Sequence, residues 1–584
     1  MTIGAQSDPV ARGDNVKKLP IGIQTFSKII EGDYAYADKT QHIYNLINNA
    51  SYYFLSRPRR FGKSLLLDTI GEVFKGNKEL FRGLWIYGSD YSFEKYPVIR
   101  LDMSNIPNET PDILKNSLMR ELNHLAKKED VEIIGDEPAD LFKRLIECLH
   151  AKYGKKTVVL IDEYDKPIID HLFEIPAAEA NRMVVKGFYG VLKSMDPHLK
   201  FTFLTGVSKF VKTSVFSELN NLTDITMVEK YTNICGISAD ELDTLFGEHI
   251  ESLRPLRAFQ NCNNIHDEII RWYDGYSWDG INRVINPFSL LSLFVQKKFG
   301  AFWYASGNPK FLIDLIKKNP NEFLNLKTLE MTEQTLDAAD FNKLEAKPLL
   351  FQTGYLTVKD VVYNGVAPSY MLEAPNLEVR EAFHKNIIAA FTESGHSEAD
   401  NFHFGMGKAL RAGDLPKALD ALRSLFASIP YNLHVEASSE NPWERGRLAR
   451  IFLKNAGMMP ALPAKNEVFG GCVDLEAYYH SIFYAVMNVL GFRMDAEAAV
   501  SKGRVDAALE LDDKVYIMEF KYEQCPQDAS EEKKQKLFEA ALKDGMEQIN
   551  ARGYHVKYTD SGKTVYKVAF AFLGRDDIEM RVEQ

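Results

Sequence analysis

The feature that most constrains the fold is a Gly-Lys-Ser triplet between an apolar stretch and a helical pattern. Tyr52–Leu55 is short, apolar and aromatic, which predicts a buried strand. Gly62, Lys63 and Ser64 are followed by "LLLDTIGEVF", whose apolar residues recur at helical spacing. The order strand, loop, helix is the setting of a phosphate loop, in which helix amides and the helix dipole favour an anion. We expect Lys63 to reach the outer phosphates and the Ser64 hydroxyl to ligate magnesium.

The loop departs from the usual phosphate loop at its first position. Arg57 stands five residues before Gly62, where a glycine is the rule. Arg59 and Arg60 follow Pro58 and add positive charge close to the expected phosphates. From the loop alone, two interpretations stay open: a nucleotide site, or a basic turn that contains Gly-Lys-Ser by chance.

A second stretch, "KKTVVLIDEYDKP", favours the nucleotide site. Thr157–Ile161 is an unbroken apolar run, typical of a central parallel strand that is covered on both faces. Asp162 and Glu163 follow at its carboxyl end, where open α/β sheets bind ligands. We expect Asp162 to serve as the magnesium-side carboxylate and Glu163 to orient or deprotonate the attacking water. The alternative is a strand that ends in a solvated acidic turn.

Two further strands and the helices between them predict an α/β fold with a parallel sheet. The strands are residues 97–104 and 201–204, and helical patterns cover 114–125 and 181–193. The second strand runs into "TGVSKF", and we expect Ser208 to sense the outer phosphate from this neighbouring strand end.

The middle of the chain offers weaker signals. Ser238 with Glu241 predicts a helix that begins with a capping box. The segment "WYDGYSWDGINRVINPFSLL" predicts a β-hairpin packed on the preceding domain. Gly307-Asn308-Pro309 precedes a helical pattern and resembles the Gly-x-Pro turn that contacts nucleotide in the helical lid of signalling ATPases related to AAA proteins. Residues 349–376 predict a strand, turn and strand like the wing of a winged helix, whose one lysine, Lys359, does not indicate DNA binding.

The last informative stretch is "SKGRVDAALELDDKVYIMEFKYE". It predicts two strands joined by a turn, with Asp506 early in the first and Glu519 and Lys521 on one face of the second. Upstream, Glu476 and His480 are four residues apart on a predicted amphipathic helix. Solvated cross-strand charges are the structural alternative. The apolar "VYIM" before Glu519 favours a central strand instead, and buried carboxylates that face a lysine need a metal or another partner.

The N-terminal part resembles the AAA-ATPase-like family found beside nuclease domains in bacteria. The resemblance covers roughly residues 17–380 and rests on several motifs in order: "LPIGIQTFSKIIEGDYAYADKT", "SRPRRFGKS", "VVLIDEYDKPI", "TGVSKF", "WYDGYSWDGINRVINPFSLL" and "FQTGYLTV". An arginine at the position of Arg57 is usual in that family, which resolves the ambiguity of the loop in favour of a nucleotide site. The resemblance implies ATP binding and hydrolysis.

The C-terminal part resembles the PD-(D/E)XK nuclease superfamily over roughly residues 450–575. The resemblance implies that Asp506 and Glu519 hold Mg²⁺, and that Lys521 positions or activates the attacking water. It also implies that Glu476 completes the metal site and that Gln548 lies on a helix near the metal. One departure is that acidic residues outnumber basic ones in this part of the chain, unlike the surface of a tight nonspecific DNA binder.

Composition limits the partners and the compartment. The 584-residue chain has a net charge of −11, so nucleic acid must be bound by a local patch. Its five cysteines are scattered with no Cys-x-x-Cys pair, and no signal peptide or membrane span is evident, so we expect a cytoplasmic protein without a membrane partner. DNA is the favoured nucleic acid, and a homo-oligomer is compatible with the sequence.

The sequence predicts four regions. These are an AAA-like ATPase core (17–226), a helical lid with a winged-helix-like segment (227–377), a helical connector (378–450) and a restriction-endonuclease-like α/β domain (451–584). We expect ATP-gated, magnesium-dependent cleavage of nucleic acid. The alternatives are a nucleotide-dependent regulatory switch, or a nucleic-acid-binding ATPase whose nuclease fold is inactive.

Overall fold

The computed structural model describes most of the chain as two units. The described residues are 16–172, 174–209, 215, 221–260, 262–303, 329–337, 346–363, 365, 367–380, 382, 405–427, 494–500, 503–511, 513–523, 525, 529–553, 558, 562–573 and 577–584. Unit 1 comprises Met1–Gly307 with Thr328–Glu378, and unit 2 comprises Asn308–Lys327 with Val379–Gln584.

Unit 1 is built on a five-stranded sheet in the order β2-β3-β4-β1-β5, and every pair in it is parallel. The strands are β1 (Tyr52–Ser56), β2 (Val98–Asp102), β3 (Thr157–Asp162), β4 (Leu199–Gly206) and β5 (Thr223–Asp224). All residues of β1 and β3 are buried, as expected for strands with helices on both faces. The expected α/β fold with a parallel sheet is confirmed.

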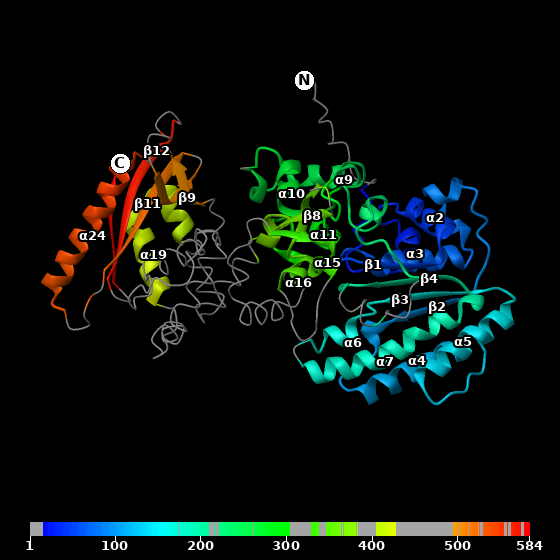
Figure 1. Ribbon diagram of the computed structural model, residues 1–584. Coiled ribbons are helices and arrows are strands. Elements are labelled where there is room, and N and C mark those ends of the chain that lie inside the picture. The colour runs from blue at the N-terminus through cyan, green and yellow to red at the C-terminus, as the bar shows by residue number, and fades with distance from the viewer. Residues whose placement is uncertain are drawn as a thin grey trace, which may run out of the picture. The chain divides into compact units, whose positions relative to one another are not determined.

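Helices cover both faces of this sheet (Figure 1). In that view α4, α5 and α7 lie along one face, and α2 and α3 lie on the other. The helices of this part are α1 (Phe26–Glu31), α2 (Thr40–Asn49), α3 (Lys63–Phe74), α4 (Pro111–Lys128), α5 (Pro138–Tyr153), α6 (Lys166–Ile169) and α7 (Ile175–Ser194). Short 3-10 helices are η1 (Lys78–Phe81), η2 (Trp85–Gly88), η3 (Met103–Asn105), η4 (Asp196–His198) and η5 (Glu229–Ile234). Apolar faces of the helices close the core over the strands.

The rest of unit 1 combines a helical cluster with a small antiparallel sheet. The helices are α9 (Ala239–Leu253), η6 (Arg257–Phe259), α10 (Ile265–Tyr273), α11 (Pro287–Gln296), α15 (Glu333–Asp337) and α16 (Ala346–Thr353). The expected capping box of Ser238 and Glu241 is present at the start of α9. The sheet has the order β6-β8-β7, with β6 (Leu329–Thr332), β7 (Thr357–Tyr363) and β8 (Pro368–Glu373).

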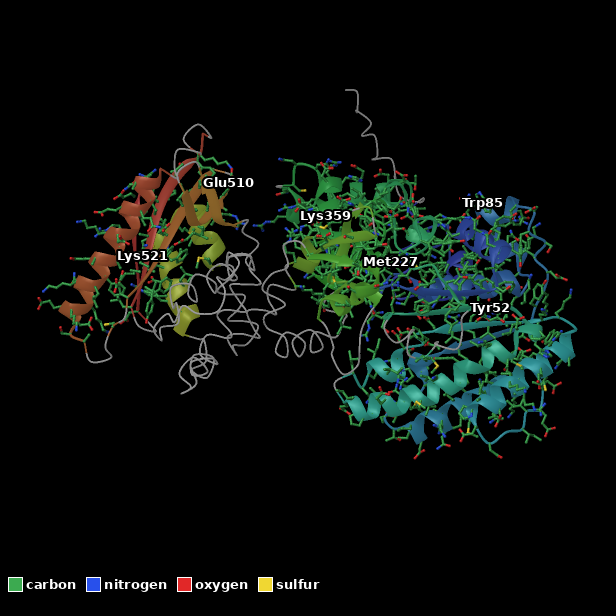
Figure 2. The ribbon with its side chains drawn as sticks, viewed as in Figure 1. Tyr52, Trp85, Met227, Lys359, Glu510 and Lys521 are labelled. Atoms are coloured by element: carbon green, nitrogen blue, oxygen red, sulfur yellow. The ribbon has the colours of Figure 1, made fainter. Side chains whose placement is uncertain are left out.

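The expected hairpin in the wing-like segment is present, since β7 and β8 are antiparallel neighbours. Lys359 on β7, labelled in Figure 2, pairs with Glu373 on β8. The Gly307-Asn308-Pro309 turn lies outside the described residues.

Unit 2 contains a second five-stranded sheet, in the order β13-β12-β11-β10-β9. The strands are β9 (Met494–Val500), β10 (Gly503–Glu510), β11 (Lys514–Glu523), β12 (Thr564–Leu573) and β13 (Asp577–Glu583). The pair β11–β12 is parallel and the other pairs are antiparallel. The long helix α24 (Glu531–Arg552) packs on β11 and β12 through a core that includes Val515, Ile517, Met546 and Ile549.

Part of the expected connector belongs to this sheet domain. Residues 405–427, which end in α19 (Leu415–Ala427), pack against it. The Tyr516 hydroxyl donates to the carbonyl of Leu410, and Arg423 donates to the carbonyl of Ile578 and to the Glu579 carboxylate. Helix α19 therefore supports the sheet domain besides connecting to it.

Among the described helices, none combines the length and the apolar character that crossing a bilayer requires.

Candidate active sites

The phosphate loop connects β1 to α3 as the sequence predicted. Gly62 occupies the N-cap of α3 with φ of 92°, and no side chain caps the first turn of this helix. A Cβ at Gly62 would meet nothing within 4 Å. The amides of the first turn are therefore available to an anion at this helix start. The Lys63 ammonium is buried and donates to the carbonyls of Arg57 (3.0 Å) and Pro58 (3.1 Å), so it lies across the loop itself.

The two expected carboxylates follow β3. Asp162 is buried, and burial raises the pKa of its carboxyl group, while the Ser64 hydroxyl and the charge of Lys63 act in the opposite direction. The structure thus brings Lys63, Ser64 and Asp162 together. Glu163 is half-buried with φ of 48°, a left-handed conformation that is strained for a glutamate. Its amide donates to Asp162 Oδ1 at 3.0 Å, which links the two acidic residues through the backbone.

Arg57, at the first position of the loop, is a buried structural residue. Its guanidinium stacks 3.7 Å from the ring centroid of Trp278 and donates to the carbonyls of Ser56 and Thr226, each at 2.9 Å, and of Tyr231 at 3.2 Å. Burial lowers the pKa of this guanidinium to about 10. The side chain therefore points into the protein, and Arg59 and Arg60 are the arginines of the loop that reach solvent.

The structure gives Ser208 a different environment from the one expected. Its amide and its hydroxyl each donate to Asp165 Oδ2 at 2.6 Å, and it is 1% exposed. Asp165 also accepts from the amide of Val207, so its carboxylate ties the end of β3 to the loop after β4. The Ser208 hydroxyl is thus engaged with a protein carboxylate, and we do not retain it among the proposed phosphate contacts.

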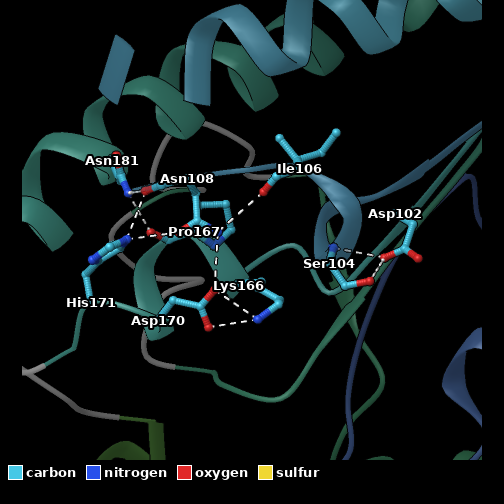
Figure 3. A network of polar contacts seen from close by, with 9 residues as sticks. All are labelled: Asp102, Ser104, Ile106, Asn108, Lys166, Pro167, Asp170, His171 and Asn181. Atoms are coloured by element: carbon cyan, nitrogen blue, oxygen red, sulfur yellow. Dashed lines mark hydrogen bonds and ion pairs between the residues drawn. The ribbon is translucent and has the colours of Figure 1, made fainter. Parts of the chain in front are cut away.

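A polar network fixes the segment that follows the two acidic residues (Figure 3). Asn108 donates to Asp170, which also accepts from Lys166 of α6. His171 Nε2 lies 2.9 Å from both the backbone and side-chain oxygens of Asn108, so that nitrogen carries the proton. Asn181 of α7 donates to the carbonyls of Asn108 and Pro167. The network holds α6 against α7 and the segment after β2.

The second site lies where β10 separates from β11. The two strands are paired from Ala507 opposite Met518 onward. At the preceding residue, Asp506 Oδ2 accepts from the amide of Phe520 at 2.9 Å, so a side chain takes the place of the backbone ladder. Asp506 is thereby anchored beside the β11 segment that carries Glu519 and Lys521.

Glu519 and Lys521 extend the face of β11 that packs on α24. Gln548 of α24 joins them: its amide nitrogen donates to Glu519 Oε1, and its oxygen accepts from Lys521 Nζ at 2.8 Å. Lys521 also pairs with Asp544 of α24 at 3.2 Å. Figure 2 labels Lys521 on this strand. Glu519 is 1% exposed, so its carboxylate is held in a desolvated position that requires compensation by donors or a cation.

The donor set of this site suits a hard divalent cation. Asp506 and Glu519 offer carboxylate oxygens, the ligands that Mg²⁺ prefers, and Mg²⁺ is commonly held by one or two carboxylates together with waters. Within the described parts of the chain, no group of three or more metal-ligating side chains comes together. The third expected ligand, Glu476, and its neighbour His480 lie outside the described residues.

Three residues of the sites carry no sequence signal that assigned them a role. Asp165 lies in "DEYDKP" and reads as part of an acidic turn, although it organises the loop after β4. Asp544 lies four residues before Gln548, a helical spacing that could have pointed to it. Arg57 departs from the usual glycine and is typical of the resembled family, but its contacts with Trp278 depend on the tertiary fold.

Comparison with known proteins gives two family matches and one long relative. Residues 20–216 match the family described as predicted AAA-ATPase, and residues 474–581 match the PD-(D/E)XK nuclease superfamily. A protein of Azotobacter chroococcum mcd 1, described as an uncharacterized protein in the vnfD 5'region, is 34% identical over 558 residues. This alignment covers 95% of the chain and 96% of that relative.

Proposed function

Because the chain belongs to the family in which a predicted AAA-ATPase domain precedes a PD-(D/E)XK nuclease superfamily domain, we propose that it is an ATP-gated, metal-dependent nuclease. The two domains support a nucleotide-dependent nuclease at the level of the family. The gating, the metal and the DNA preference are parts of the proposal.

At the first site, we assign ATP binding to the start of α3. The amides of that turn, Lys63 and the outward arginines Arg59 and Arg60 would neutralise the phosphates. Ser64 and Asp162 supply oxygen ligands for the accompanying Mg²⁺. On ATP binding, Lys63 would exchange the carbonyls of its own loop for phosphate oxygens. Glu163 is the residue that would orient the attacking water, because it follows Asp162 at the carboxyl edge of the sheet.

At the second site, Asp506 and Glu519 would hold Mg²⁺, and Glu476 would complete the ligand set. A divalent cation bound there polarises a phosphodiester and lowers the pKa of a bound water. Lys521 contributes a positive charge next to these carboxylates and stabilises the charge that develops on the phosphate. Gln548 and Asp544 keep its ammonium on this side of β11.

The observation that carries the proposal is the coupling of Glu519, Gln548 and Lys521 beside Asp506. Solvated surface charges, the structural alternative, would not place a carboxylate at 1% exposure with an amide of α24 bound to it. Two carboxylates and a lysine on adjoining strand segments support a site for phosphodiester cleavage.

The proposal is tested with the purified full-length chain on single-stranded DNA, duplex DNA and RNA. Each substrate is incubated with Mg²⁺ or Mn²⁺, with and without ATP. We expect cleavage that depends on the metal and increases with ATP. Asp506→Ala and Lys521→Ala should abolish it, whereas Lys567→Ala on the neighbouring strand should not. Folding is checked for each variant by circular dichroism and thermal unfolding.

The ATPase half is tested by Lys63→Ala, with Lys75→Ala at the other end of α3 as its matched control. Loss of ATP turnover in the first variant alone supports the assignment, and retained turnover would contradict it. If the wild-type protein turns over ATP but cuts none of the substrates, the nucleotide-dependent switch replaces the nuclease as the favoured function. Nucleic-acid binding without cutting would favour the binding ATPase with an inactive nuclease fold.

A further inference from the structure

Every residue of the phosphate loop before Gly62 contacts the second half of unit 1. Three of these contacts are made by side chains of the loop on aromatic rings: the Arg57 guanidinium lies 3.7 Å from the ring of Trp278, the Arg60 guanidinium lies 5.1 Å from that of Phe288, and the ring of Phe61 lies 4.7 Å from that of Tyr276. The aromatic residues belong to the motif "WYDGYSWDGINRVINPFSLL", to which the chemistry of ATP gives no role.

The remaining two loop residues contact Trp303 and Gly354. The indole nitrogen of Trp303 donates to the carbonyl of Arg59 at 3.1 Å. Gly354 has φ of +93°, and a Cβ added there would lie 2.8 Å from the Cβ of Pro58 and 3.3 Å from the Trp303 ring. A larger residue at this position would therefore displace the loop or the ring.

The same segment also holds the loop after β4. The side-chain oxygen of Gln352 accepts from the amide of Lys209 at 2.7 Å, and its nitrogen donates to the carbonyl of Leu336. Two residues of "FQTGYLTV", Gln352 and Gly354, thus contact loops at the carboxyl edge of the sheet. These two loops flank the expected position of the phosphates.

Trp303 is itself anchored by a buried carboxylate. Its backbone amide donates to Glu378 Oε1 at 2.7 Å, and Glu378 is fully buried. The indole therefore has little freedom to turn away from the loop, because both its backbone and its ring nitrogen are bound.

We propose that Tyr276, Trp278, Phe288, Trp303, Gln352 and Gly354 form a clamp that positions the phosphate loop and the loop after β4 for nucleotide. This inference rests on the proposed nucleotide site and assigns positioning residues to it. An ordinary phosphate loop keeps its shape through glycine, which this loop lacks at its first position. Here the shape is imposed from outside by the clamp, so nucleotide binding depends on residues about 200 to 300 positions further along the chain, as counted from Arg57 to Tyr276 and Gly354.

The decisive variant is Gly354→Ala, and the chain offers a matched control in Gly365→Ala. Gly365 has φ of +82° in the turn between β7 and β8, and a Cβ there would meet nothing within 4 Å. Both substitutions strain a left-handed backbone, but only the first presses on Pro58. We expect the KM for ATP to rise about tenfold or more in Gly354→Ala and by less than about twofold in Gly365→Ala.

A second variant removes one donor and keeps the fold. Trp303→Phe retains an aromatic ring but loses the hydrogen bond to Arg59, and we expect faster hydrogen exchange of the amides of Arg57 and of residues 59–62 without nucleotide. Its ATP turnover should show a raised KM with a smaller change in kcat, which a general loss of stability would not produce. Trp85→Phe, far from the loop in sequence and exposed, serves as the control.

The outcomes separate the clamp from the proposed function. Unchanged loop exchange in Trp303→Phe, or equal KM values in folded Gly354→Ala and Gly365→Ala, would overturn the clamp even if the wild type hydrolyses ATP. A wild type that does not bind ATP would overturn the proposed function, while loop exchange without nucleotide still decides whether the clamp positions the loop. If Gly354→Ala fails to fold, the exchange measured in Trp303→Phe decides alone.

Discussion

Arg57 occupies the first position of the phosphate loop, where a glycine is usual, and its buried side chain anchors the loop through hydrogen bonds and a contact with Trp278. A glycine at this position would leave the space of a guanidinium empty and would remove donors from the carbonyls of Thr226 and Tyr231. We therefore predict that Arg57→Gly, which restores the usual glycine, lowers the free energy of unfolding of unit 1 by about 3–5 kcal/mol. Urea denaturation followed by circular dichroism measures this loss.

Arg60→Gly is the matched control for that variant. Arg60 has φ of 69° and an exposed side chain, so glycine suits its backbone and its removal empties no buried space. Its free energy of unfolding should stay within about 0.5 kcal/mol of the wild-type value. Equal losses in the two variants would show that Arg57 acts only as a charge of the loop.

The buried carboxyl group of Glu378 should make the free energy of unfolding of unit 1 depend on pH. Burial raises the pKa of its carboxyl group from 4.5 to about 7, against the Ser289 hydroxyl and the amides of Trp303 and Phe302, which favour the ionised form. Besides burial, the charge of the ionised Glu378 carboxylate raises the pKa values of the nearby Tyr273 and Tyr276 hydroxyls. Because the folded-state pKa is the higher one, the contribution is fully present below pH 4.5 and is lost as the pH rises through 7. The total loss is on the order of 3 kcal/mol.

Glu378→Gln tests this prediction. The glutamine side chain keeps an oxygen that accepts from the backbone amide of Trp303, but it cannot ionise. The free energy of unfolding of the variant should therefore not show this decline between pH 5 and pH 8 (~3 units around the pKa). Free energies of unfolding for wild type and variant are compared at each pH, which cancels the titration of groups that both share. Parallel curves over that range would mean that Glu378 titrates near its ordinary value.

The sequence predicts the roles of residues whose chemistry determines their position in the fold. It does not predict roles that depend on how side chains pack in the tertiary structure. Lys63, Ser64 and Asp162 come together because the loop after β1 and the end of β3, two parallel strands separated by β4, lie at the same carboxyl edge of the sheet. Ser208 follows β4 at that edge, but the sequence does not indicate its partner Asp165. That hydrogen bond depends on the exact turn that follows β3, which periodicity does not report.

Among the elements, α24 approaches the sheet closely at one glycine, Gly545, which packs against Ala569. A Cβ on Gly545 would lie 3.0 Å from the Cβ of Ala569 on β12 and 3.6 Å from Cγ of Lys521. Ala569 is fully buried in the middle of the sheet and has little room to move. We predict that Gly545→Ala pushes α24 outward, loosens the contact of Gln548 with Glu519 and Lys521, and lowers the cleavage rate at least about tenfold.

Gly187→Ala on α7 is the control for a helical glycine. Its Cβ would meet nothing within 4 Å, so alanine should stabilise that helix by up to about 1 kcal/mol. Cleavage rates are measured for both variants under the same metal conditions. A normal rate in Gly545→Ala would mean that the helix adjusts without moving Gln548, and that the close approach is not needed for the site.

The sequence predicted the elements whose apolar residues form a clear pattern, either a helical repeat or a continuous run. It did not predict which surface α19 packs against. Strands such as β3 are continuous apolar runs, which leave few alternatives to a buried parallel strand. The helical pattern around α19 has an apolar face, but a period alone does not say which surface the face covers. The contacts of α19 with β13, and of Leu410 before it with β11, made part of an expected connector a component of the sheet domain.

At the scale of the whole molecule, the two units have separate cores and separate candidate sites. The last passage of the chain from unit 1 into unit 2 follows Glu378, the residue that anchors the Trp303 end of the clamp. Within unit 1, two hydrogen bonds connect the phosphate loop to this boundary: the indole of Trp303 donates to the carbonyl of Arg59, and the Trp303 amide donates to Glu378.

Separate cores predict two unfolding transitions, of which only one responds directly to nucleotide. ATP with Mg²⁺ at a hundredfold excess over its Kd should stabilise unit 1 by about 2.7 kcal/mol, because it binds the folded unit alone. Scanning calorimetry of the full chain measures both transitions, and Lys63→Ala should abolish the shift while leaving both transitions visible. Unit 2 gains stability from ATP only through whatever coupling joins the units, so the shift of its transition measures that coupling. A single transition that moves as one with ATP would contradict independent units and would mean that the two cores unfold together.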